Sequence, residues 1–269
     1  MTRLLLPAAI TLVFASAVPL LWMLLASVTP ESRLFEAAGL WRGEFVLQHY
    51  RTLFAERDFW TPIRNSLIVA STTTLFAVTL GGACAYALAR MHFRGRYAIL
   101  AFVLAVSMFP QISLVAPLYM LLREAGLINT YPGLVLPYLT FAMPLTIWLL
   151  VGYFRQLPAD LEDAAAMDGA GRIRTLVEIV APVAWPGIAT TAILTFVYCW
   201  NEFLFALSFT LGPERHTVPV AIALFRGQYQ VPWGQILAAA AVATLPVLAL
   251  VLVFQRRITE GLTSGAVKG

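Results

Sequence analysis

Long apolar stretches alternate with shorter polar segments along the whole chain. Six apolar stretches reach the roughly 20 residues of helix that cross the hydrocarbon core of a bilayer. They cover residues 4–28, 65–89, 97–122, 131–154, 185–211 and 236–255. The pattern therefore predicts an all-α membrane protein, with six transmembrane helices in a single domain that covers residues 1–269.

The polar segments predict the topology. Three arginines between residues 90 and 96 mark one connection as cytoplasmic, because arginine and lysine accumulate on that side of a membrane. Counting spans from there places segment 155–182 and both chain ends in the cytoplasm, with segments 29–64 and 212–235 outside. The second external segment contains an apolar insert, 218–225, that is too short to cross a bilayer, so we expect it to dip in or to pack on the surface.

Two of the predicted spans have unusual residues in their interior. The third contains Pro110 and Pro117, and internal prolines free carbonyl groups and bend helices. The fifth contains the one acid that falls in the middle of a span, and an acid there is unfavourable by a few kcal/mol unless it is paired or hydrated. Its neighbours could bind a sugar along a substrate path, or the acid could make a structural contact between helices. The residues concerned are Tyr198, Trp200, Asn201 and Glu202.

Composition excludes several classes of protein. Hydrophobic residues make up 60% of the 269 residues and charged residues only 12%, against about 25% in soluble domains. The net charge of +4 comes from residues scattered over the loops, so no nucleic-acid patch is expected. The one lysine, Lys268, is followed by glycine, whereas a nucleotide-binding P-loop needs Gly-Lys-Ser/Thr. ATP, if it drives this protein, is therefore expected to be hydrolysed by another chain.

Cysteine and histidine give no sign of a metal or redox site. Cys84 and Cys199 lie in different apolar stretches, which excludes a disulfide framework and a Cys-x-x-Cys motif. His49, His92 and His216 fall in three separate loops, where we expect them to be solvated. Neither Gly-x-Ser-x-Gly nor His-Glu-x-x-His occurs, so the motifs of a membrane enzyme are missing.

The predicted cytoplasmic segment is rich in acids. Asp160 is expected to cap a short helix, with Glu162 and Asp163 in its first turn, where carboxylates suit the positive end of the helix dipole. The less polar side of this helix consists mostly of small residues, namely Leu161, Ala164 and Ala165. Such a helix could lie in a groove on another protein.

A second short helix is expected to follow. Gly169 and Gly171 are expected to end the first helix, because glycine readily adopts the left-handed backbone found there. Pro182 is expected to stop the second helix. Between them, apolar residues recur at spacings of three and four and predict one shared face of Ile173, Leu176, Val177 and Val180.

One pattern in this segment resembles a known family. An acid and two alanines are followed after three residues by a glycine, after nine more by an isoleucine, and then by Ala-Pro one residue on: Asp163, Ala164, Ala165, Gly169, Ile179, Ala181 and Pro182. The spacing resembles the EAA loop of ABC importer permeases, although the family usually has Glu in place of Asp163 and Leu in place of Ala181. Asp168-Gly169-Ala170 and Trp200-Asn201-Glu202-Phe203 resemble the carbohydrate-importing branch, the maltose and trehalose kind.

The resemblance covers nearly the whole chain and implies a specific machine. It implies an ABC importer permease fold in a bacterial plasma membrane, with both termini cytoplasmic and a coupling helix in the EAA loop. The residues expected to contact the ATPase are Asp160, Glu162, Asp163, Ala164, Ala165, Asp168 and Gly169. The implied partners are a second homologous permease subunit, two ATPase subunits that bind ATP and Mg, an extracytoplasmic solute-binding protein and membrane lipid. No cofactor, metal or nucleic acid is expected on this chain, and the tail at 261–269 could reach the ATPase interface or be a flexible terminus.

Other functions stay open. An ion-coupled secondary transporter would show repeated halves and several intramembrane ionisable groups, of which only Glu202 is found. Among ABC importers, a trehalose- or maltose-like disaccharide is the expected cargo. Glycerol phosphate is the main rival, and an amino acid or phosphate is more distant.

Overall fold

The computed structural model describes residues 2–36, 43–225 and 231–264. The described residues are mostly helical and form no β-strand. The longer helices are α1 (Thr2–Ser27), α3 (Trp60–Arg90), α4 (Arg96–Ser107), α5 (Gln111–Glu124), α6 (Tyr131–Gln156), α10 (Trp185–Trp200) and α13 (Trp233–Ser264). The shorter elements are η1 (Glu31–Arg33), α2 (Gln48–Arg51), η3 (Thr52–Glu56), α7 (Asp160–Met167), α8 (Arg172–Arg174), η4 (Thr175–Val180), α9 (Ala181–Val183), α11 (Leu204–Phe209) and α12 (Val218–Ala223).

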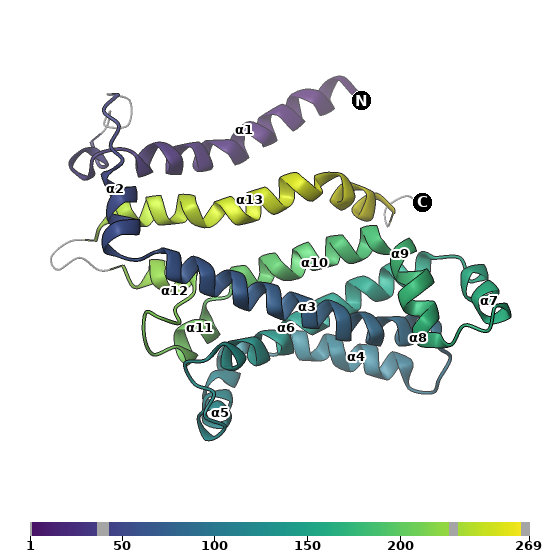
Figure 1. The fold of residues 1–269 in the computed structure, drawn as a ribbon. Coiled ribbons are helices and arrows are strands. Elements are labelled where there is room, and N and C mark those ends of the chain that lie inside the picture. The colour runs from purple at the N-terminus through teal and green to yellow at the C-terminus, as the bar shows by residue number, and fades with distance from the viewer. Residues whose placement is uncertain (1, 37–42, 226–230, 265–269) are drawn as a thin grey trace.

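Most of the longer helices run side by side, up and down one bundle (Figure 1). Helices α3 and α6 pack closely on each other, α10 packs on both, and α13 packs between α10 and α1. The short helix α7 projects at one end of the bundle, and α2, α5, α11 and α12 lie toward the other. We name these the α7 end and the α12 end. The first turn of α1 and the last turn of α13 both lie at the α7 end.

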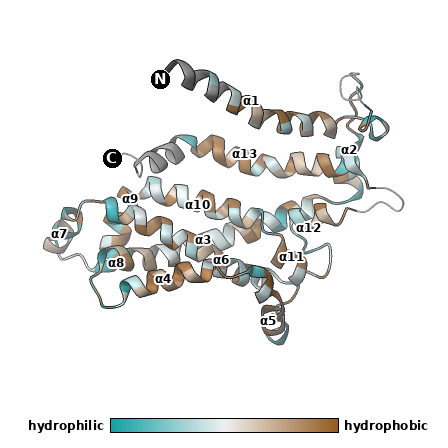
Figure 2. Ribbon diagram, turned by 180° about the vertical axis from the view of Figure 1, so that it is seen from behind, coloured by the Kyte–Doolittle hydropathy of each residue, from teal (hydrophilic) through white to brown (hydrophobic). Residues whose placement is uncertain are grey.

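Among the described residues, three helices are long and apolar enough to span a membrane on their own: α3, α6 and the part of α13 from Trp233 to Gln255. Two further spans are possible if each of two bent helix pairs counts as one. Figure 2 shows hydrophobic residues along the bundle and hydrophilic ones gathered near α7, α8 and α2. The described part of α1 adds an apolar helix, Thr11–Ser27.

Two predicted spans are not continuous helices. The span expected at 97–122 is broken after Ser107, and α4 and α5 meet there at 93°. Pro110 directly precedes α5, and its missing N–H and fixed φ explain the break. The span expected at 185–211 is also wrong as one helix, because α10 ends at Trp200 and the chain is helical again only from Leu204.

The core consists of two clusters of buried side chains. At the α12 end, the fully buried rings of Phe59, Tyr138, Phe205 and Phe209 pack together with apolar residues from α3, α5, α6, α10, α11, α12 and α13. The insert expected near the surface lies here as α12, with Val218 and Val220 at 1% and 0% exposure. Its hydrophobic residues are thus part of the core and explain why the insert is apolar.

The second cluster lies at the α7 end. It joins α3 and α6 to the chain that leads out of α7, and it contains Tyr86, Leu150, Phe154, Val180 and Ala184. We name residues 157–184, between α6 and α10, the α7 segment. Because Val180 and Ala184 lie near its end, apolar packing fixes this part of the α7 segment to the bundle.

One histidine prediction is wrong. His49 is only 8% exposed, and its ring nitrogen Nε2 lies 2.9 Å from the carbonyl oxygen of Thr29. The ring packs against Gly234 so closely that a Cβ there would lie 2.3 Å from it. His49 therefore holds α2 against the start of α13, while His92 is exposed as expected.

Candidate functional site

The α7 segment leaves the bundle at the end of α6 and returns to it at α10 (Figure 1). Its first helix forms as predicted, but the residue at its N-cap is Ala159, and no side chain caps it. Asp160 is the first helical residue, and it lies with Glu162 and Asp163 in the first turn. Three carboxylates there stabilise the helix through its dipole, which compensates for the missing cap.

The residues expected to contact the ATPase divide into two groups. The first group is exposed and contains three aspartates and two small residues, namely Asp160, Asp163, Ala164, Asp168 and Gly169. We name this group the acidic rim. Ala165, by contrast, is 2% exposed and faces the bundle. Glu162 is partly buried, and its Oε1 lies 3.2 Å from Nε of Arg90 at the end of α3. Only the first group is free to contact another protein.

The turn after α7 depends on one glycine. Gly169 has φ of +75°, a left-handed backbone that strains any residue with a side chain. Gly171 was expected to behave likewise but has φ of −71° and an extended backbone, so it precedes α8 without left-handed geometry. Only Gly169 is required by the backbone.

The second helix of the segment differs from its prediction in two ways. The elements α8, η4 and α9 together run through Pro182, which does not stop the helix; the chain turns by 85° only between Val183 and Trp185. Its apolar residues also do not share one environment. Val180 is fully buried, whereas Ile173 and Val177 are 81% and 61% exposed.

The intramembrane acid lies at a helix break. Glu202 is 8% exposed, and its carboxylate accepts the backbone N–H groups of Phe205 at 2.7 Å and of Ala206 at 3.1 Å. These N–H groups open α11 and have no acceptor inside the helix. The carboxylate therefore caps α11, and this structural contact accounts for the acid.

The three neighbours of Glu202 do not form one cluster with it. Trp200 is 3% exposed and donates its indole N–H to the carbonyl oxygen of Ala243 on α13 at 3.2 Å. Tyr198 is half-buried, and its hydroxyl accepts a hydrogen bond of 2.6 Å from the amide of Gln111 at the start of α5. Asn201 is exposed. Of the four residues, Tyr198 and Asn201 present polar groups that a solute could reach.

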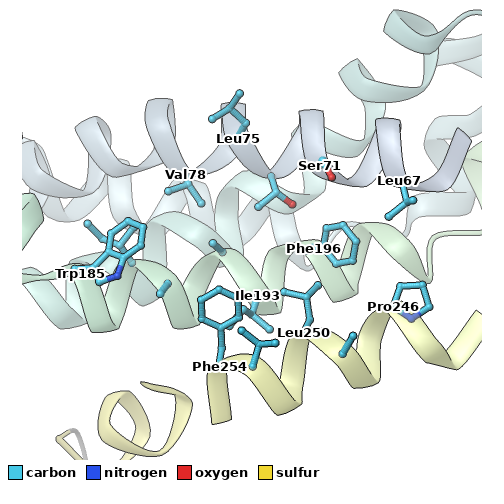
Figure 3. Close-up of a pocket in the computed structure, with 16 residues that line it drawn as sticks. Leu67, Ser71, Leu75, Val78, Trp185, Ile193, Phe196, Pro246, Leu250 and Phe254 are labelled. Atoms are coloured by element: carbon cyan, nitrogen blue, oxygen red, sulfur yellow. The ribbon is translucent and has the colours of Figure 1, made fainter. Parts of the chain in front are cut away.

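An apolar pocket lies between α3, α10 and α13 (Figure 3). It has a volume of about 760 Å³, and its lining includes Trp185, Ile193, Phe196, Leu250 and Phe254. Ser71 and Thr74 supply its only hydroxyl groups. A sugar needs many hydrogen-bonding partners, so this pocket does not fit one.

A polar network at the α12 end was not predicted from the sequence. The amide nitrogen of Asn65 donates to the carbonyl oxygens of Glu214 and His216, both at 3.0 Å. The Tyr131 hydroxyl donates to Oδ1 of Asn65 at 2.8 Å, and the Asn129 amide donates to Glu214 Oε1 at 2.7 Å. These contacts fix residues 211–217 to the starts of α3 and α6.

Two ionisable groups in this network have shifted pKa values. The hydrogen bond from Asn129 lowers the pKa of Glu214 below its ordinary value, because it stabilises the carboxylate. Burial lowers the pKa of His216, because it disfavours the charged imidazolium. Among the described residues, no group of three or more His, Cys, Asp or Glu side chains could hold a metal ion.

Solved structures share this arrangement of helices. A crystal structure of a bacterial ABC transporter involved in the import of the acidic polysaccharide alginate contains a chain that matches with a TM-score of 0.77 at 21% identity. The match covers 94% of this chain and 95% of that one. At this identity the likeness concerns the fold.

Sequence relatives cover almost the full length. The trehalose/maltose transport system permease protein MalG of Thermococcus litoralis is 42% identical over 269 residues, 99% of this chain and 96% of the relative. The trehalose transport system permease protein SugB of Mycobacterium tuberculosis is 45% identical over 253 residues, 93% and 92% of the two chains. Residues 77–263, more than half of the chain, match the model of one family, the binding-protein-dependent transport system inner membrane component. The chain therefore belongs to the family of binding-protein-dependent transport system inner membrane components.

Proposed function

We propose that this chain forms one half of the translocation pore of an ATP-driven importer for a disaccharide of the trehalose or maltose type. The observation that carries the proposal is the identity of 42% and 45%, over nearly the whole chain, with permeases named for trehalose and maltose transport. In this proposal the chain is not an enzyme. It supplies the path for the sugar and transmits the movement of the ATPase subunits to the pore. ATP and Mg are bound by those separate ATPase subunits.

The proposed topology has six spans in a bacterial plasma membrane. Helices α1, α3, α6, α10 and α13 each supply one span, and α4 with α5 supplies another. Two observations support a cytoplasmic α7 end. The arginines between residues 90 and 96 lie there, and positive residues favour that side. The first turn of α1 and the last turn of α13 also lie at the α7 end, so both termini would be cytoplasmic.

The acidic rim of α7 is the proposed contact with the ATPase. Asp160, Asp163 and Asp168 would face a groove on that subunit, and the small side chain of Ala164 would permit close approach. Closure of the two ATPase subunits on ATP would move α7 as a rigid lever. Helix α6 leads into α7 by a short connection, and α10 is joined to it through α8, η4 and α9. Such rigid-body movement between discrete states would switch the pore between inward-facing and outward-facing forms.

The proposed substrate path includes Tyr198 and Asn201. Tyr198 and Asn201 each have one hydrogen-bond partner within the chain but are accessible, and their hydroxyl and amide groups suit the hydroxyl groups of a sugar. Trp200 and Glu202 are buried and bond within the fold. A second, homologous permease subunit would complete the pore. A solute-binding protein would deliver the sugar at the α12 end, where residues 211–217 are held in place.

The test is a pull-down of the tagged chain from detergent-solubilised membranes, followed by ATPase assays on what is recovered. We expect a P-loop ATPase and a second six-helix chain to co-purify, and the solute-binding protein loaded with trehalose or maltose to stimulate hydrolysis. Stimulation by glycerol phosphate instead would reassign the cargo. Recovery of the chain alone or as a homodimer would refute the importer and return attention to ion coupling.

A further inference from the structure

The α7 segment has a third connection to the bundle besides its two covalent ones. Arg90, the last residue of α3, donates from its guanidinium to the carbonyl oxygen of Leu157 at 2.6 Å. The same guanidinium lies 3.2 Å from the carboxylate of Glu162 on α7. One side chain thus reaches both the chain that leads into α7 and α7 itself.

Burial makes this connection stronger than an ordinary surface ion pair. The side chains of Arg90 and Glu162 are 13% and 23% exposed. Arg174 and Glu178 form a pair at 2.8 Å in the same segment, but they are 65% and 57% exposed and lie on one helix. Exposed pairs contribute little because water and salt screen them, whereas screening is weaker for a partly buried pair.

The geometry also requires arginine in particular. Its planar guanidinium carries five donors in a fixed fork, so it can hold a carbonyl and a carboxylate at once. Beside the pair lies a polar cavity of about 340 Å³, also lined by Tyr86, His92 and Arg172. Helix α7 packs chiefly on η4, so the Arg90 bridge rather than apolar packing joins it to α3.

We propose that Arg90 is a positioning residue that makes α3 move together with α7 when the ATPase subunits close. The inference rests on the proposed function and deepens it. Glu162, expected from the sequence to contact the ATPase, instead transmits the movement inward through Arg90. Asp163, one residue on and exposed, keeps the outward role.

The test compares single and double variants in the assembled importer, reconstituted in lipid nanodiscs. The variants are Glu162→Gln, Arg90→Gln and both together, with Glu178→Gln as the matched control for loss of an exposed pair. Three quantities are measured: the ATPase recovered in a pull-down, the thermal midpoint, and the ratio of stimulated to basal ATPase activity.

We expect the ATPase subunits to co-purify with the Glu162→Gln variant as before and its thermal midpoint to be unchanged. The stimulation ratio should fall by about fivefold, which is within the range measured for the coupling of two residues in contact. The double variant should be no worse than Arg90→Gln, because the two residues act through one contact. Multiplied effects in the double variant, or a Glu162→Gln ratio equal to that of Glu178→Gln, would overturn the proposal. Failure of the unaltered chain to recover any ATPase would instead refute the proposed function.

Discussion

Two short interruptions of helix in this molecule differ in burial and in the partners of their polar groups. The glycine turn, residues 168–171, lies outside the bundle and its side chains face solvent, apart from the partly buried Ala170. The Glu202 break, residues 201–203, lies between α10 and α11, and its buried carboxylate accepts backbone N–H groups from the first turn of α11. The sequence predicted the glycine turn as a helix end, but it placed Glu202 inside a single span, 185–211.

The contrast separates contacts made within the chain from contacts left for a partner. A break whose freed donors are satisfied internally holds the fold together, because unpaired polar groups are strongly unfavourable in a membrane. A turn whose polar residues stay exposed contributes little to the fold and is free to serve a partner. Substitutions at the two breaks should therefore affect different properties.

The largest effect is expected from Glu202→Ala. It leaves two N–H groups of α11 without an acceptor in the core, which should destabilise the fold by at least about 2 kcal/mol. Thermal unfolding in detergent and the yield of monodisperse protein measure the loss. Asn201→Ala, at the exposed neighbouring position, is the control. Equal midpoints for the two variants would refute the structural role of the acid.

Gly169→Pro should abolish coupling without unfolding the bundle. Proline fixes φ near −65°, whereas the native value is +75°, so the direction of α7 must change. Uptake should fall at least about tenfold while the thermal midpoint is retained. Gly169→Ala tests the backbone alone, because an added Cβ meets nothing within 4 Å and only the strain of about 1 kcal/mol remains. Normal uptake by the proline variant would show that transport does not depend on the backbone of this turn.

Asp163→Lys should weaken recovery of the ATPase and leave the fold intact. The substitution reverses one charge of the exposed rim, which is the proposed contact surface. A quantitative pull-down measures it, and Glu44→Lys makes the same charge change at an exposed residue of the α12 end. Equal recovery for both variants would contradict the assignment of the rim.

The smallest effect is expected from mild acid, and it should concern the α12 end alone. The pKa of Glu214 and that of His216 are both lowered in the folded protein. Each group therefore favours the folded state above its unfolded pKa, and this contribution is lost as the pH falls. Of these two groups, His216 is the one expected to titrate between about pH 7.5 and 5.5, and its protonation should lower the thermal midpoint by no more than about 2 °C. The His216→Asn variant should show no such fall of the thermal midpoint. If the midpoint of this variant still fell with pH, another group would be responsible.

Local pattern predicted much of this molecule. Helices α3, α6 and α13 were predicted because continuous apolar runs need no partner to be recognised, and α7 because acids precede a glycine. The bends and the contacts of single polar residues were not predicted. Arg90 and Glu162 are 72 positions apart, and Asn65 bonds to a chain about 150 positions away, so no local periodicity connects them. For Glu202 the sequence left two roles open, and only the position of α11 decides between them.

Helix α1 packs chiefly on α13, so its main partner is a helix that follows it much later in the chain. The contacts around its end follow the same rule, since Glu31 accepts the backbone N–H of Gly234 and His49 packs on the same glycine. Synthesis proceeds from the N-terminus, so α1 must remain in the bilayer without this partner until α13 has been made. Insertion of α13, rather than insertion of α1, is the step at which this side of the bundle assembles.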